Sequence, residues 1–260
     1  DVERAPVDSV ANFVLDRAAA ASRLQQRLQR SHFAPQSVRN ATRPAELDGV
    51  LVPFWCYDAE ARSDYQADVG IHWYETVTYT VKVNGKTQVR TKQVRRTEWH
   101  ALSGSHVNRY RDHLVSGSVG ITEPESNELE PFDLGKLQAF DMSRVAGYIA
   151  ERPTVSHEKA RHVAAQEMAN LENSAIARFL PGDEVANVQN QTTMNIGEVR
   201  LILLPVWVST WRHNDDVFRL LVNGQTGEVV GRIPTSALKI WLLVLGCLLA
   251  LGLLVLVATA

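Results

Sequence analysis

The chain has 260 residues, of which 45% are hydrophobic and 22% charged, and its 27 basic and 29 acidic residues give a formal net charge of −2. This length and apolar content suffice for a buried core and exclude a disordered or fibrous protein. The near-zero charge excludes a uniformly basic nucleic-acid-binding protein, but it permits local charged patches.

The first element expected is a helix over residues 7–29. Asp8 or Ser9 can cap it, and apolar residues recur at helical spacing from Val10 onwards. An apolar run over residues 49–57, rich in strand formers, predicts a strand. A polar stretch follows, and strand signal resumes at Ile71.

Residues after Ile71 predict a β-hairpin. Apolar and polar side chains alternate from Val77 to Val83, and the following Asn-Gly pair is typical of a hairpin turn. A three-residue loop over 83–85 would place Tyr79 opposite Val89 and keep one face apolar, so we prefer this register to that of a two-residue turn.

This hairpin carries six cations and no acid between residues 76 and 97, namely Lys82, Lys86, Arg90, Lys92, Arg95 and Arg96. One interpretation is a solvated edge whose charges discourage edge-to-edge pairing. The alternative is a surface that binds anionic lipid headgroups or a partner, or, as a less favoured case, nucleic acid. These six residues are the candidate lipid- or partner-binding site.

An acidic loop over residues 123–130 precedes short helical pieces over 134–149. A longer helix is predicted over 157–180, stopped by the Pro-Gly pair at 181–182. Strands are expected over 198–210 and 217–222, and a turn over 223–227 leads to a last strand at 228–231. The apolar face predicted for the long helix comprises Ala160, Val163, Ala164, Met168, Leu171, Ala175 and Phe179.

Two similar tetrapeptides suggest an internal repeat. Val-Pro-Phe-Trp at 52–55 resembles Leu-Pro-Val-Trp at 204–207, and each follows a helix and opens a strand region. The fold class predicted is therefore α+β, with two helix-plus-antiparallel-strand units. The expected segments are an N-terminal helix and linker (1–48), a first β unit (49–122), a helical segment (123–197), a second hairpin unit (198–232), a link (233–239) and a transmembrane helix (240–260).

The transmembrane prediction rests on the uncharged tail, because no charged residue follows Lys239. A helix of 21 residues would span roughly 30 Å, the thickness of the bilayer hydrocarbon. Arg232 and Lys239 precede the span and favour a cytoplasmic location for the rest of the chain. The two cysteines, Cys56 and Cys247, are not expected to form a disulfide, because one lies in a strand and the other in the predicted span.

A search for catalytic chemistry predicts no catalytic residue and no metal site. His100, His106 and His113 are spaced six and seven apart, so they could converge, but neither strand nor helix spacing forces all three onto one face. His157 and His162 are five apart, whereas two metal ligands on one helix face require four. A metal-dependent hydrolase built on residues 100–113 therefore remains the least favoured alternative.

Several segments resemble one family of bacterial membrane proteins. They are Gly49–Ala59, Leu204–Trp207, Leu221–Gly231 and the middle region that contains Pro131–Leu134 and Gly147–Glu151. The family is commonly described as containing a TFIIB-type zinc ribbon and is often labelled as related to the primosomal replication-restart helicase. No phosphate-binding loop supports the helicase label.

The resemblance implies a zinc ribbon with two Cys-x-x-Cys pairs, which this sequence lacks, so zinc is expected only in a ribbon preceding residue 1. It also implies partners of the SPFH-domain or phage-shock type and a place in a membrane-stress response. The function expected is a non-enzymatic, membrane-anchored scaffold or adaptor, single-pass in the bacterial inner membrane. A nucleic-acid-binding membrane protein is the alternative.

Overall fold

The computed structural model describes residues 5–35, 47–83, 86–213, 216–236, 239, 241, 243–248 and 250–252. These residues form one mixed sheet of eight strands. Its main path is β3 (Lys86–Ser116), β2 (Leu47–Val83), β6 (Glu184–His213), β1 (Ser9–Val10) and β4 (Gln138–Ala139). In addition, β5 (Ile149–Ala150) pairs with β2, β7 (Asp216–Asn223) pairs with β6, and β8 (Val229–Val230) pairs with β7.

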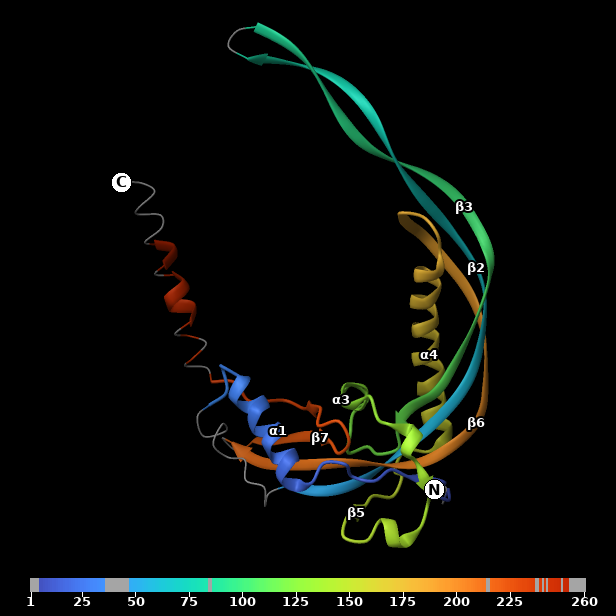
Figure 1. Cartoon of the computed structure of the whole chain (residues 1–260), viewed down its shortest axis with the longest axis vertical. Coiled ribbons are helices and arrows are strands. Elements are labelled where there is room, and N and C mark those ends of the chain that lie inside the picture. Colours follow the sequence, from blue (N-terminus) through green and yellow to red (C-terminus); the bar gives the residue numbers. More distant parts are fainter. Residues whose placement is uncertain are drawn as a thin grey trace. The chain divides into compact units, whose positions relative to one another are not determined.

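The helices are α1 (Arg17–Arg30), α3 (Glu123–Leu129) and α4 (His157–Phe179), with short 3₁₀ turns η2 (Leu134–Lys136) and η3 (Met142–Arg144) (Figure 1). The predicted fold class is wrong, because β2 and β6 are neighbours in a single mixed sheet instead of belonging to two separate units. Parallel pairs such as β1–β6 and β2–β5 also depart from the antiparallel scheme expected.

The chain forms two compact units. Unit 1 comprises Asp1–Cys56, Leu114–Ala160 and Arg200–Ala260, and unit 2 comprises Tyr57–His113 and Arg161–Val199. The three long strands and α4 contribute residues to both units.

The core of unit 1 contains both similar tetrapeptides, and their surroundings match. The carbonyl of Pro53 accepts a hydrogen bond from the N–H of Gly117, and that of Pro205 accepts one from Gly224, both at 2.8 Å. Trp207 Nε1 donates to the Leu15 carbonyl at 3.0 Å, as the indole of the first tetrapeptide does to another carbonyl. Four side chains of the tetrapeptides lie in one buried cluster with residues of neighbouring segments. The cluster includes Val52, Phe54, Leu204 and Val206 together with Cys56, Leu114, Leu129, Ile202 and Leu221.

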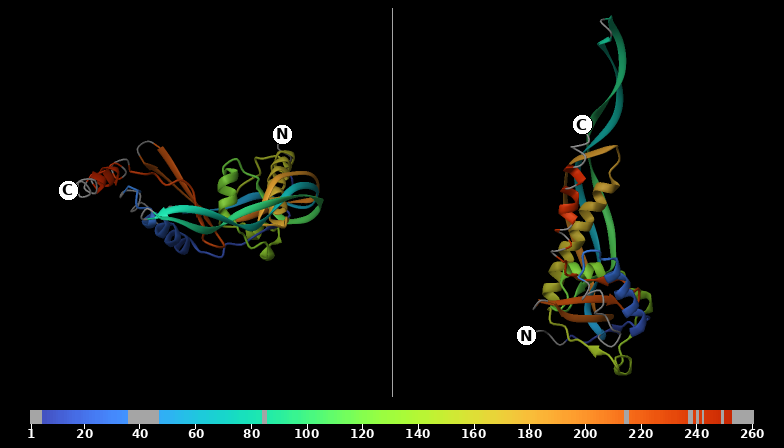
Figure 2. Two further views of the ribbon diagram at one scale, coloured as in Figure 1. Left: turned by 90° about the horizontal axis from the view of Figure 1, so that it is seen from above. Right: turned by 90° about the vertical axis from the view of Figure 1, so that its left-hand side faces the viewer.

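In unit 2, α4 covers one face of the sheet formed by β3, β2 and β6 (Figures 1 and 2). Every second residue of β2 from Tyr57 to Val69 is buried beneath the helix, and most of these residues are small or aromatic. On α4 the buried positions recur at intervals of four: Ala160, Ala164, Met168, Glu172 and Ile176. The helix bounds were predicted to within one residue, but Leu171 and Phe179 of the predicted apolar face are exposed.

The expected helix over residues 7–29 is shorter at its N-terminus. Its cap is Asp16, whose carboxylate accepts from the Ala19 N–H at 2.7 Å. Residues 9–10 instead form β1, and the carboxylate of Asp8 accepts from the Leu201 N–H of β6. A tertiary partner therefore overrides the local helical pattern in this segment.

The expected three-residue loop in the long hairpin is also wrong. Val83 belongs to β2 and Lys86 begins β3, so only residues 84–85 separate the strands, and these two lie outside the described residues. Lys92 Nζ lies 5.6 Å from the ring centroid of Tyr79. A cation therefore shares the face that carries Tyr79, whereas the preferred register would have placed it on the opposite face.

The structure also contradicts the transmembrane helix predicted over residues 240–260, and with it the single-pass inner-membrane localisation. No helix in the described part of the chain is both long enough and apolar enough to cross a bilayer. Residues 240, 242, 249 and 253–260 of the predicted span lie outside that part. A bilayer requires about 20 consecutive apolar helical residues.

Candidate interaction site on the β2–β3 ribbon

The site predicted from the cations lies on the distal part of the β2–β3 ribbon, here called the arm and defined as residues 71–83 and 86–99. Figure 1 shows the two strands of the arm continuing past the end of α4 and the start of β6. Where side-chain burial is described, no arm residue is buried, so both faces of the ribbon are at least partly exposed. A two-stranded ribbon without a covering layer is only marginally stable in water.

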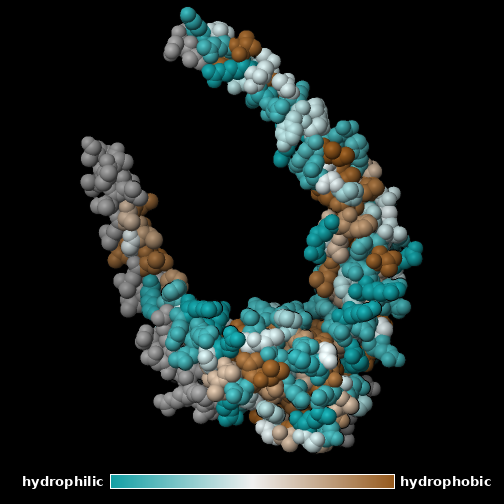
Figure 3. Space-filling model, viewed as in Figure 1, coloured by the Kyte–Doolittle hydropathy of each residue, from teal (hydrophilic) through white to brown (hydrophobic). Residues whose placement is uncertain are grey.

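Large apolar side chains are exposed on the arm. Tyr74 is 62% exposed and Val89 is 68% exposed, and the others are Ile71, Trp73, Tyr79 and Trp99. Figure 3 shows hydrophobic and hydrophilic residues interspersed along this ribbon. Exposed aromatic residues flanked by polar ones are typical of surfaces that bind another protein.

The six predicted cations fall into two groups. Arg95 and Arg96 have acidic partners, because Arg96 Nε lies 2.9 Å from a Glu75 carboxylate oxygen and Arg95 lies 3.7 Å from Glu184. The other four cations lie nearer the tip, and none of them forms an ion pair with a described carboxylate. These are Lys82, Lys86, Arg90 and Lys92, and Lys92 packs over the ring of Tyr79.

The base of the arm is fastened to the start of β6. The backbone N–H of His72 donates to the Asp183 carboxylate at 2.7 Å, and its ring Nε2 lies 2.8 Å from a Glu184 oxygen. With Arg95 also near Glu184, three groups fix the arm where it leaves the sheet. The four tip cations therefore belong to a ribbon whose base is held in position by these contacts.

A buried polar cluster in unit 2 was not predicted. The Glu172 side chain is fully buried and accepts hydrogen bonds from Ser63 Oγ at 2.9 Å, His106 Nδ1 at 2.7 Å and the Tyr110 hydroxyl at 2.7 Å. Ser63 Oγ also lies 2.8 Å from Thr192 Oγ1. The three partners of Glu172 come from β2 and β3, and Thr192, which contacts Ser63, comes from β6. Every strand beneath α4 therefore contributes to this cluster, here called the Glu172 cluster.

Burial alone would raise the pKa of Glu172, but the hydrogen bonds from His106, Tyr110 and Ser63 outweigh it and hold that pKa below the usual range. Burial, followed by the hydrogen bond to the Glu172 carboxylate, raises the pKa of Tyr110 to about 12. A carboxylate that bridges a serine and a histidine does not activate the serine, because in hydrolases the histidine lies between the other two. The cluster therefore fastens α4 to the sheet.

The three histidines considered for a metal site contact different carboxylates. His106 binds Glu172, His113 Nε2 lies 2.9 Å from Glu167, and His100 lies 3.7 Å from Glu98. Among the described residues, no group of three or more His, Cys, Asp or Glu side chains is placed to hold a metal ion. The zinc-ribbon class is accordingly not supported by this part of the chain.

The chain is similar to the uncharacterized protein YdjG of Bacillus subtilis (strain 168), with 25% identity over 238 residues. The aligned region covers 88% of this chain and 64% of YdjG, so the chain spans less than two thirds of that relative. No protein-family model matches the chain. No solved structure matches it either. This identity is too low to assign the chain to a family, and the relative's name carries no activity.

Proposed function

We propose that the protein is a non-enzymatic adaptor whose arm binds an acidic surface of a protein partner. The observation that carries the proposal is the group of four tip cations without a described acidic partner, set among exposed aromatic side chains. Tryptophan, tyrosine and arginine are enriched in the energetically dominant part of protein interfaces, and lysines around them add charge complementarity towards an acidic partner.

Protein is favoured over nucleic acid for two reasons. The arm combines its cations with Ile71, Val89 and two tryptophans, and such apolar area suits a protein surface. The chain as a whole is slightly acidic, with a sequence pI of about 6.5, so no wider basic field surrounds the arm.

The test measures binding by the full chain, with fluorescence anisotropy, of three labelled probes: a poly-glutamate peptide, a DNA duplex and purified SPFH-domain or phage-shock-type proteins. The test variant changes Lys82, Lys86, Arg90 and Lys92 to Glu. We expect the protein probes to bind and the variant to lose at least about tenfold in affinity, because complementary charges become like charges.

A matched control changes Arg62 and Arg111 to Glu, since both are exposed cations of the same strands outside the arm. This control should retain the affinity of the unmodified chain. Failure to bind any protein probe contradicts the proposal. So does preferential DNA binding whose affinity falls with salt at a log–log slope of about −0.9 per phosphate, which would indicate nucleic-acid recognition.

A further inference from the structure

Besides the arm, unit 2 has a second exposed feature, which is the edge of β6 that faces away from β2. On one side β6 pairs with β2, as the contacts Asp68–Asn187 and Ser63–Thr192 show. On its other side, β1 pairs at Ile202–Leu203 and β7 pairs from Val206 onwards. Among the described residues, no strand pairs with that side of β6 before residue 202.

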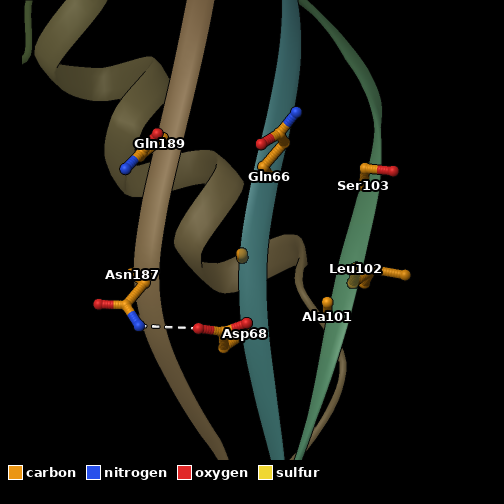
Figure 4. Close-up of a pocket in the computed structure, with 8 residues that line it drawn as sticks. Gln66, Asp68, Ala101, Leu102, Ser103, Asn187 and Gln189 are labelled. Atoms are coloured by element: carbon orange, nitrogen blue, oxygen red, sulfur yellow. Dashed lines mark hydrogen bonds between the residues drawn. The ribbon is translucent and has the colours of Figure 1, made fainter.

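Exposure along β6 is consistent with an open edge. Val188 is 37% exposed, and Thr192, Met194 and Ile196, which lie on the face that carries α4, remain only partly buried. Figure 4 shows β6 beside β2, with β3 beyond it and α4 behind the three strands. Gln189 and Asn187 extend from β6 on the face away from the helix (Figure 4).

The composition of this edge is unusual for an unpaired strand. Residues 185–197 contain no charged residue and no proline, and five of the 13 are Asn or Gln. Exposed edges are normally protected by charges, prolines or bulges. Asn187 has a φ of 51°, which interrupts the regular strand, but from Val188 to Gly197 no such device is present.

The other edge of the three-stranded sheet of unit 2, formed by β3, differs from the β6 edge in its charge. β3 carries seven Lys and Arg residues from Lys86 to Arg111, so two copies of that edge would repel each other. Asp112, with a φ of 55°, further distorts its end. Of these two edges, the β6 edge is the one compatible with a second copy of itself, because uncharged amide side chains can donate and accept across a two-fold axis.

We propose that two copies of the chain join through residues 188–197 of β6, which pair antiparallel about a two-fold axis. The three-stranded sheet of unit 2 then becomes a continuous six-stranded sheet in the dimer. The backbone groups of the edge would supply most of the hydrogen bonds, as in other cases of strand addition. The Asn and Gln side chains on the exposed face would form cross-strand pairs.

The experiment measures the mass of the full chain in solution by light scattering and sedimentation equilibrium, over about a hundredfold dilution series. One variant changes Gln189, Gln191 and Thr193 to Lys, and a second changes the same residues to Glu. All three side chains are exposed, so neither variant disturbs the core. Each should weaken the dimer by about tenfold or more, because like charges meet across the axis.

An equimolar mixture of the Lys and Glu variants should restore the dimer, since opposite charges then face each other. The control changes Ala101, Ser103 and Ser105, exposed residues of β3, to Lys and should leave the dimer unchanged. Circular dichroism verifies that each variant is folded. A monomeric unmodified chain overturns the proposal, and so does a dimer that the β6 variants leave intact or that the mixture fails to restore.

Discussion

The Glu172 cluster allows a quantitative prediction about the stability of unit 2. The substitution Glu172→Gln preserves the shape of the side chain but removes its charge. Glutamine can still accept from Ser63 and His106 through its single carbonyl oxygen, while its amide group would face the Tyr110 hydroxyl. That hydroxyl can rotate and accept, so no severe clash is expected.

The cost of this substitution follows from the hydrogen bonds. A bond to a charged group contributes about 1.5–3 kcal/mol and a neutral one about 1 kcal/mol. The three bonds to Glu172 lose their charge assistance together, and the fully buried site offers no water to compensate. We expect the free energy of unfolding to fall by about 2–3 kcal/mol at pH 7.

The effect should depend on pH in a defined direction. The folded-state pKa of Glu172 is lowered, so ionisation of this group stabilises the folded chain above the ordinary pKa of a glutamate, about 4.3. That stabilisation is lost as the pH falls through the lower folded-state value. The difference between the unmodified chain and Glu172→Gln should therefore be constant near neutral pH and shrink below about pH 4.

Urea unfolding followed by circular dichroism measures this difference across the pH range. The control is Glu60→Gln, which removes a surface carboxylate lying 3.0 Å from Arg109 and should cost under about 1 kcal/mol. If Glu172→Gln cost no more than the control at pH 7, or if its cost grew towards acid, the assigned role of the Glu172 cluster would be refuted.

Three further predictions concern unit 1, each measured by urea unfolding. Asn223→Asp should cost about 3 kcal/mol, because the buried amide of Asn223 donates to two backbone carbonyls, at 2.8 and 3.1 Å, and a carboxylate would repel both. Gly224→Ala should cost about 2 kcal/mol or more, since its new Cβ would lie 2.8 Å from the Pro205 carbonyl oxygen. The control is Gly135→Ala, whose new Cβ would lie 3.4 Å from its nearest neighbour and which should change stability by under about 0.5 kcal/mol. Trp207→Phe should cost about 1–2 kcal/mol through loss of the indole hydrogen bond, and a cost near zero would show that this bond contributes nothing.

Elements with strong local signals could be predicted from the sequence. The long helix α4 was recognised from its apolar spacing and its terminal Pro-Gly pair. The β7–β8 hairpin was recognised from its turn sequence, and the structure pairs Leu221 with Val230 as a short antiparallel ladder. The Asn223 side chain accepts from two backbone N–H groups of that turn, which explains why its sequence is informative.

Elements that depend on distant partners could not be predicted. The polar composition of residues 58–70 suggests a break between two strands, although β2 runs through them without interruption. Their inward positions include Ala59, Ala61 and Ser63, which are too small to show the apolar alternation that marks a half-buried strand. Helix α4 lies close over them, so small side chains are required where large ones would have given a signal.

The candidate site likewise has features that the sequence shows directly and features that depend on distant residues. The arm cations were visible as a run of like charge, but their separation into paired and unpaired groups depends on Glu75 and Glu184, which the strand geometry supplies. Glu172 had a signal that was misinterpreted. It occupies the interval-of-four series of buried α4 residues, whereas the predicted face, which lists apolar residues alone, contains Leu171 in its place.

The pairing of β1 with β6 has a consequence for the order in which the chain acquires its structure. Ser9 pairs with Ile202, so 193 positions separate the two partners. At about 5–20 residues per second, a ribosome needs roughly 10–40 s to synthesise that interval. The N-terminal strand must therefore wait, while the β2–β3 ribbon, whose strands are adjacent in sequence, can pair long before. The arm is thus expected to be exposed to binding partners during synthesis before unit 1 is complete.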